Sequence, residues 1–151
     1  WYNRAGVERV MGFCSDEEYD VFMKQAPEFE RMIVDAGIHL TKFWFSVTQR
    51  DQRTRCAIRQ IDPVRRGKRS PMDLESLGRW DVYTAAKDAM IAATDTDHAP
   101  WMSVRSNDKK RARLNAMRFF LSQFDYEDKD HEVVGTVDPR IVHRARDIKG
   151  D

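Results

Sequence analysis

The chain has 151 residues, of which 41% are hydrophobic and 34% are charged. This composition is typical of one globular domain and excludes a disordered, highly charged segment. The formal net charge is only +1, so any site for anions must come from local clustering of Lys and Arg. No apolar run reaches membrane-spanning length, and the two cysteines form neither a disulfide framework nor a metal motif. We therefore expect a cytoplasmic protein with no membrane partner.

The first third of the chain predicts three helices. Residues 3–12 predict a short helix that ends at Gly12. Ser15 and Glu18 have the spacing of a capping box, which predicts a second helix with three residues turned inward: Tyr19, Phe22 and Met23. Pro27 predicts the start of a third helix that ends at Gly37 and has a separate apolar stripe: Phe29, Met32 and Ile33.

Residues 38–47 are β-branched or aromatic over most of their length. This pattern predicts a strand that is covered on both faces, as in a parallel sheet. A helix followed by such a strand is the rhythm of an α/β protein. A second capping box, Thr48 to Asp51, then begins a helix over 49–61, which Asp62-Pro63 ends.

A basic loop follows, with four cationic side chains in five positions: Arg65, Arg66, Lys68 and Arg69. A third capping box, Ser70 to Asp73 with Pro71 between them, begins the next helix at once. Cations on a loop between two helices suit a ligand with several negative charges, above all phosphates. The plainer alternative is a solvated basic loop.

The second half of the chain continues the alternation. We expect the helix after Ser70 to run to about Thr94 with a bend near Gly78, and a short strand over 101–105. Asn107 or Ser106 is expected to cap a further helix with an apolar stripe: Leu114, Met117, Leu121 and Phe124. From Asp125 onward the pattern fades, and residues 131–151 are expected to form a C-terminal tail or arm. This tail either attaches an arm to a neighbour through Val133, Val134 and Val137 or is loosely ordered.

The residue patterns also limit the chemistry. Four scattered histidines give no nucleophilic triad, no cluster has metal-ligand spacing, and no GxxxxGK[ST] loop is present. We therefore assign no metal ligands to this chain. A helical hairpin with a cationic tip, inserted between two strands, fits a lid that closes over a phosphoryl group.

Several motifs, in order, resemble the polyphosphate kinase 2 family. They are WYNRAGVE at residues 1–8, Asp62-Pro63 with Arg65 and Lys68, SPMDLES at 70–76, Arg79-Trp80, ATDT at 93–96, APW at 99–101 and DKKRARLN at 108–115. The resemblance covers residues 1 to about 130. The SPMD form is similar to the single-domain branch of the family, which favours nucleoside diphosphates.

The resemblance implies the C-terminal part of a P-loop kinase-like, three-layer α/β/α fold with parallel strands and a helical lid at about 49–79. It implies transfer of a terminal phosphoryl group between inorganic polyphosphate and a nucleoside diphosphate, ADP or GDP, with Mg²⁺. In the family, the phosphate loop and the Walker B acid precede the WYNR segment. We therefore expect residues 1–130 to be part of a catalytic domain that is inactive without its upstream half. A homo-oligomer, dimer or tetramer, is also implied.

The resemblance further implies five site residues. Arg4, Arg65 and Lys68 match catalytic positions, and Asn3 and Arg59 match substrate-binding positions at the phosphate channel and the lid. Their expected role is to pair with the phosphates of polyphosphate and of the nucleoside di- or triphosphate. Two positions depart from the family: Gly67 replaces a usual Trp, and Arg69 replaces a usual apolar residue. We expect these changes to make the tip more flexible and more basic.

The alternative function is a non-enzymatic module that binds polyanions or nucleic acid. Its support is the same basic residues, with Trp44, Trp80 and Trp101 as candidate stacking groups. These aromatic residues fall on core spacing, and the chain is not strongly basic, so nucleic acid is the less favoured partner.

Overall fold

The computed structural model describes residues 1–68 and 70–147, without the side chains of residues 68, 71, 73 and 74. The chain divides into two compact units. We call Trp1–Phe29 with Thr48–Thr94 the helical unit, and Glu30–Val47 with Asp95–Asp151 the sheet unit. Each unit is described by itself.

The beginning of the helical unit follows the sequence pattern. A π-helical turn, Arg4–Glu8, continues into α1 (Arg9–Met11), which ends at Gly12 with φ +71°. This left-handed conformation costs glycine nothing and explains the end of the helix. The predicted capping box is confirmed, because Glu18 N donates to Ser15 Oγ at 3.2 Å and Ser15 N donates to Glu18 Oε2 at 2.9 Å.

The predicted helix start at Pro27 is wrong. A continuous helix, α2 (Asp16–Asp35), contains Pro27 in its interior and ends before Gly37. Pro27 removes one N–H donor, but Ala26 and Glu30 on either side of it are buried, so packing holds the helix through this position. The expected apolar stripe also fails, because Phe29 is 51% exposed and Met32 is 68% exposed.

The rest of the helical unit is a succession of helices between β1 and β2. Helix α3 (Gln49–Ile61) has the predicted bounds and ends where Asp62 adopts an extended conformation before Pro63. A short 3-10 turn, Arg66–Lys68, leads to α4 (Pro71–Leu77), and α5 (Trp80–Thr94) follows. The helix predicted from 70 to 94 is therefore two helices, because the chain leaves the helical conformation at Gly78 and Arg79.

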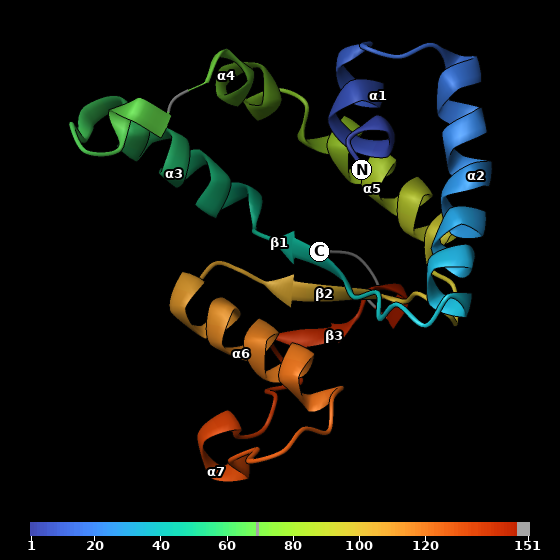
Figure 1. Ribbon diagram of the computed structural model, residues 1–151. Coiled ribbons are helices and arrows are strands. Elements are labelled where there is room, and N and C mark those ends of the chain that lie inside the picture. The colour runs from blue at the N-terminus through green and yellow to red at the C-terminus, as the bar shows by residue number, and fades with distance from the viewer. Residues whose placement is uncertain (69, 148–151) are drawn as a thin grey trace. The chain divides into compact units, whose positions relative to one another are not determined.

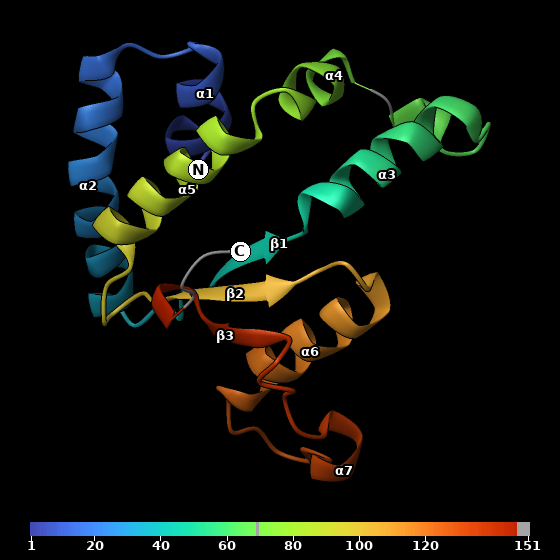
Figure 2. The ribbon, with the colours of Figure 1, turned by 180° about the vertical axis from the view of Figure 1, so that it is seen from behind.

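The sheet unit contains three strands in the order β1-β2-β3, as Figures 1 and 2 show from opposite sides. Strand β1 (Lys42–Ser46) pairs with β2 (Trp101–Arg105) in parallel, with Lys42 opposite Trp101. The expected parallel pair and α/β class are confirmed. Strand β1 is shorter than the predicted 38–47 and is not covered on both faces, because Phe45 is 54% exposed.

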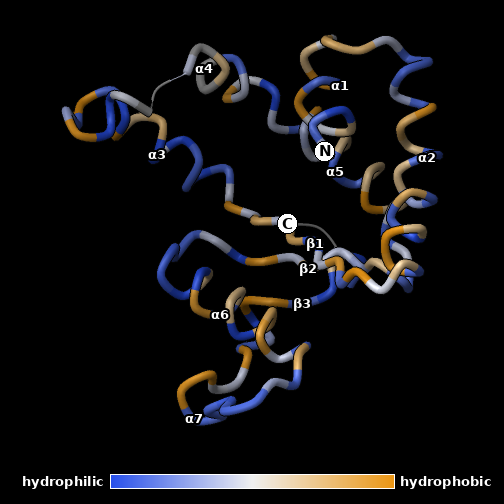
Figure 3. Tube along the Cα trace, viewed as in Figure 1, coloured by the Kyte–Doolittle hydropathy of each residue, from blue (hydrophilic) through white to orange (hydrophobic). Residues whose placement is uncertain are grey.

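Helix α6 (Lys109–Ser122) packs against β2 and β3. Its cap is Asp108 rather than Ser106 or Asn107, and Asp108 accepts hydrogen bonds from Lys110 N and Arg111 N at 2.9 and 3.1 Å. The core cluster joins these elements: Val104, Ala112, Ala116, Ile141 and Val142. The predicted apolar stripe of α6 is not the buried face, because Leu114 and Met117 are 43% and 57% exposed. Figure 3 shows the apolar residues of β2 beside the mixed pattern of α6.

The C-terminal segment is ordered over its described residues, against the expectation of a loose tail. After α7 (His131–Val134), β3 (Val142–Arg144) pairs antiparallel with β2, and a 3-10 turn follows over Ala145–Asp147. Ile141 and Val142 are at least 92% buried, and burial of such side chains contributes about 1.5–3 kcal/mol each. The sheet is therefore mixed rather than purely parallel.

Candidate functional site

The hairpin formed by α3, the turn Arg66–Lys68 and α4 is the candidate lid. Thr48 caps α3 by accepting a hydrogen bond from Asp51 N at 3.3 Å, and Arg55 pairs with Asp51 at 2.7 Å. Helices α3 and α4 contact each other directly. Figure 3 shows that α3 consists largely of hydrophilic residues, so little apolar burial holds it, which is a property of elements that move.

The tip of the hairpin is organised by Asp62. Its Oδ1 accepts hydrogen bonds from Val64 N at 2.9 Å and Arg65 N at 3.4 Å, the pattern of an Asx turn. Its Oδ2 lies 3.2 Å from Arg65 Nε, and the Arg65 side chain is 58% exposed. The guanidinium of Arg65 is therefore held on a turn that faces solvent.

The other cations of the candidate lid differ in their solvent exposure and in how far the structure describes them. Arg59 is half-buried in the last turn of α3, where a positive charge is favourable beside the helix C-terminus. Arg66 is exposed in the 3-10 turn. The backbone of Lys68 belongs to that turn, but its side chain lies outside the described structure, and so does the whole of Arg69. The proposed flexibility and basicity around Gly67 and Arg69 thus stay predictions.

The N-terminal candidates lie at the start of the π-helical turn Arg4–Glu8, which contacts α1 and α5; Arg4 is its first residue and Asn3 precedes it. The Arg4 Nε donates to Glu8 Oε2 at 2.8 Å, and its Nη1 lies 3.7 Å from Glu18 Oε1. The bond with Glu8 raises the pKa of Arg4 above its usual value, and the charge of Glu18 adds to this effect. Asn3 is exposed, and its side chain makes no capping bond to the turn. A phosphate would therefore have to exchange partners with two carboxylates at Arg4.

The structure thus groups the five candidates by element. It places Arg59, Arg65 and the Lys68 backbone on one hairpin, and Asn3 and Arg4 on one turn. Glu8 and Asp62, which neutralise two of the candidate cations, were missed from the sequence. Their positions at i+4 from Arg4 and i−3 from Arg65 are the signal that could have found them.

Arg79 has a structural contact that its motif did not reveal. It stands between α4 and α5, and its Nη1 donates to the carbonyl of Val10 at 2.9 Å. This bond satisfies a carbonyl near the end of α1 and ties the start of α5 to it. Arg79 therefore acts in packing within the helical unit.

The tryptophans that could have stacked on nucleic-acid bases are not exposed. Trp101 is 94% buried, with Lys42 Nζ 4.9 Å from its ring centroid, and Trp44 and Trp80 are half-buried. The burial of Trp101 agrees with the prediction from strand spacing, and Trp44 and Trp80 are only partly accessible. These three tryptophans therefore offer no fully exposed ring on which a base could stack.

No metal site is evident within residues 1–68 and 70–147. No group of three or more His, Cys, Asp or Glu side chains stands close enough to hold an ion in this part of the chain. The described residues therefore identify no ligands for Mg²⁺, and no step below is assigned to one. Among the same residues, no helix combines the length and apolarity that crossing a bilayer requires.

Comparison with known proteins agrees with the sequence motifs. The family model for polyphosphate kinase 2 matches residues 1–132. The polyphosphate kinase PPK2B of Corynebacterium glutamicum is 62% identical over 151 residues, which are 100% of this chain and 49% of the relative. The GDP-polyphosphate phosphotransferase of Mycolicibacterium smegmatis is 64% identical over 145 residues, 96% of this chain and 51% of the relative.

A solved structure has the same fold. The polyphosphate kinase 2 of Arthrobacter aurescens matches with a TM-score of 0.73 at 24% identity, over 87% of this chain and 49% of that chain. The chain thus spans about half the length of the curated relatives it matches. On the family model, the identity to these relatives and the shared motifs, the chain belongs to the polyphosphate kinase 2 family.

Proposed function

We propose that this chain is part of a phosphotransferase that moves a terminal phosphoryl group between inorganic polyphosphate and a nucleoside diphosphate. The observation that carries the proposal is the match of residues 1–132 to the polyphosphate kinase 2 family. A second support is the hairpin with a cationic tip, which is inserted in the sequence between the parallel strands β1 and β2. Phosphoryl transfer depends on positive charge placed around the phosphate oxygens.

In this proposal, the hairpin at about 49–79 is the lid, and Arg65, Lys68 and Arg59 lie on it. Closure would bring the exposed Arg65 guanidinium onto the phosphate chain, where it forms charge-assisted hydrogen bonds. Asn3 and Arg4 would line the edge of the phosphate channel. Arg4 would exchange its bonds with Glu8 and Glu18 for bonds with phosphate oxygens as substrate binds.

The remaining parts of the proposal rest on the family. The acceptor is ADP or GDP, and the Mycolicibacterium relative that is 64% identical is named for GDP. The phosphate loop and the ligands of Mg²⁺ would lie outside the described residues, in a P-loop kinase-like half of the protein. The isolated 151-residue chain would then be inactive, and the complete enzyme would be a cytoplasmic dimer or tetramer.

The experiment uses a chimera in which this chain replaces its matching stretch in the Corynebacterium relative. Phosphorylation of ADP and GDP is measured with polyphosphate and Mg²⁺, for the chimera and for the isolated chain. We expect turnover by the chimera and none by the isolated chain. Turnover by the isolated chain would contradict the proposal that part of the site lies outside this chain.

Lid variants of the chimera test the residue roles. Arg65→Ala and Lys68→Ala are each expected to lower kcat at least roughly tenfold, about 1.4 kcal/mol of transition-state stabilisation. Arg53→Ala changes an exposed arginine on helix α3 of the same hairpin; it is the matched control and should leave kcat within about twofold. Equal effects at all three positions, or none at Arg65 and Lys68, would overturn the lid assignment.

A binding comparison separates this function from the nucleic-acid alternative. The chimera should prefer long-chain polyphosphate to duplex DNA at equal salt and equal phosphate concentration. Salt sensitivity by itself cannot discriminate, because both polyanions release counterions. Tighter binding of DNA would favour the alternative.

A further inference from the structure

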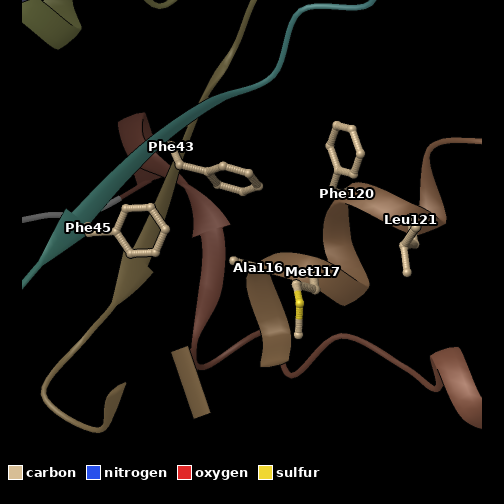
Figure 4. A pocket seen from close by; sticks show the side chains of 6 residues that line it. All are labelled: Phe43, Phe45, Ala116, Met117, Phe120 and Leu121. Carbon is tan, nitrogen blue, oxygen red and sulfur yellow. The ribbon is translucent and has the colours of Figure 1, made fainter. Parts of the chain in front are cut away.

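An apolar groove between β1 and α6, drawn in Figure 4, offers no donor to a phosphate. Its lining consists of six side chains without a nitrogen or oxygen atom: Phe43, Phe45, Ala116, Met117, Phe120 and Leu121. Binding of a polyanion depends instead on cationic and N–H donors. All five candidate site residues belong to the helical unit, so the residues that position them are to be expected there.

The five candidates stand on two parts of the helical unit. One part is the hairpin, in which α3 contacts both the turn Arg66–Lys68 and α4. The other part, which we call the base, consists of the π-helical turn Arg4–Glu8, α1 and α5, and these three contact one another. The chain passes from the hairpin to the base at Gly78 and Arg79, between the end of α4 and the start of α5.

Arg79 is attached to the base by its side chain and by its backbone. Its Nη1 donates to the carbonyl of Val10 at 2.9 Å, and its own carbonyl accepts a hydrogen bond from Tyr83 N at 2.9 Å. Val10 is 8% exposed, and carbonyls at the end of a helix have no partner within that helix. A hydrogen bond from a guanidinium is charge-assisted and stronger than one between neutral groups. Arg79 is therefore a fixed point at the end of the hairpin.

The residue that Arg79 holds is joined to the turn that carries Arg4. Val10 lies in α1, which directly continues the π-helical turn. Glu8 Oε2 accepts from Arg4 Nε at 2.8 Å, and Glu8 N donates to the carbonyl of Asn3 at 2.9 Å. A continuous path of hydrogen bonds and helical backbone thus runs from Arg79 to both N-terminal candidates.

We propose that Arg79 is a positioning residue that fixes the end of the hairpin to the turn that carries Asn3 and Arg4. This role presupposes the proposed function of the hairpin as a lid. A lid absorbs its closing motion at a few residues at the ends of its elements, and the break between α4 and α5 is such a place. With this anchor in place, the closing hairpin brings Arg65 to the same stretch of phosphate that Arg4 meets. Arg79 acts through Val10 and does not itself contact the substrate.

Steady-state kinetics of the Corynebacterium chimera test this role. Arg79→Met keeps a long side chain but removes the donor to Val10, whereas Arg79→Lys keeps a donor. We expect Arg79→Met to lower kcat at least about fivefold and to change KM for polyphosphate less than about twofold, because a displaced lid still reaches the substrate but in a less productive geometry. Arg79→Lys should retain at least about half of the kcat of the unsubstituted chimera, because its ammonium can donate to the same carbonyl.

The matched control is Arg118→Met in the sheet unit. Arg118 Nε donates to the carbonyl of Val134, the last residue of α7, at 2.9 Å, so this variant loses the same kind of bond away from the hairpin. Its kcat should stay within about twofold of the unsubstituted chimera. Rates are measured well below both thermal midpoints, so that unfolding does not contribute. Equal effects of the two Met variants on kcat would overturn the positioning role.

Hydrogen–deuterium exchange of the chimera tests the anchor without using activity. Arg79→Met should raise the exchange rate of the Tyr83 amide at least about threefold and leave the amides of α6 within about 1.5-fold. Unchanged exchange at Tyr83 would overturn the proposal, whatever the activity. A loss of kcat in Arg65→Ala with none in Arg79→Met would overturn this inference alone and leave the proposed function standing. A chimera without turnover would count against the proposed function, and the exchange at Tyr83 would still decide whether Arg79 is an anchor.

Discussion

Glu30 of α2 and Lys42 of β1 form a buried ion pair in which Glu30 Oε2 and Lys42 Nζ are 2.7 Å apart. The two side chains are 0% and 4% exposed. Burial lowers the pKa of Lys42, whereas the hydrogen bond with Glu30 and the charge of Asp95 oppose this change. The pair attaches the last turns of α2 to the first residue of β1 within the sheet unit.

Breaking this pair should be costly. Glu30→Leu or Lys42→Met alone leaves one charge buried without its counterion, which typically costs about 3–5 kcal/mol. The double variant Glu30→Leu/Lys42→Met removes both charges and should recover most of that loss. Urea unfolding of the four proteins measures the coupling, and additive losses in the double variant would show that the two charges do not depend on each other.

Asp138 should make stability depend on pH in the acid range. Its bonds with the Arg140 guanidinium and Arg140 N, followed by the charge of Arg140 and a bond from Arg111, lower its pKa from 3.8 to about 2. Because the folded pKa is the lower one, the stabilisation is present above about pH 4 and is lost as pH falls toward 2. The difference in thermal stability between the wild type and Asp138→Asn should therefore shrink over this window. A difference that is constant from pH 6 to pH 2 would contradict the ionic origin.

Gly135 should not tolerate a side chain. It follows α7 with φ 66° and ψ −172°, a region that is essentially restricted to glycine. An added Cβ would lie 3.0 Å from Arg118 Nη2, while Arg118 Nε holds the carbonyl of Val134 at 2.9 Å. Gly135→Ala should cost about 1–3 kcal/mol. Gly12→Ala, at φ +71° with open space around it, is the control and should cost about 1–2 kcal/mol. A smaller loss at Gly135 than at Gly12 would argue against this strain.

Asp62→Asn should strengthen binding of polyphosphate if the hairpin is the lid. The substitution keeps an oxygen that can accept from Val64 N, and it removes the charge that pairs with Arg65 at 3.2 Å. Release of an exposed ion pair is worth about 0.2–1 kcal/mol, so KM for polyphosphate should fall roughly 1.4- to 5-fold in the chimera. An unchanged or higher KM would mean that Arg65 does not meet the substrate.

The local signals in the sequence predicted much of the fold. The capping residues Ser15 and Thr48 are where the pattern placed them, because a cap depends on groups only a few residues apart. Helix α3 has the predicted bounds for the same reason. The prediction of a new helix at Pro27 was wrong, because the packing of the buried residues Ala26 and Glu30 outweighs the hydrogen bond that proline cannot donate.

Non-local pairing explains the other differences. Strand β3 is only three residues long, and Val142 has a strand partner only because β2 lies opposite it. Clustering of charge in the sequence identified the basic loop, whereas the choice of Arg59, Arg65 and Lys68 within the lid rests on the family resemblance. Of the two partners of Arg4, Glu8 stands at i+4 and is a local signal, whereas Glu18 depends on how the turn at Arg4 meets α2, which periodicity alone does not encode.

Strand β3 has a practical consequence for work with shortened genes. The family match ends at residue 132, so a product trimmed to that boundary would lose Ile141, Val142 and the hydrogen-bonded neighbour of β2. Strand β2 would then have an unpaired edge, and the apolar side chains that β3 covers would be exposed to solvent. Such a polypeptide should accumulate in inclusion bodies, whereas one that extends through residue 147 keeps its own cover.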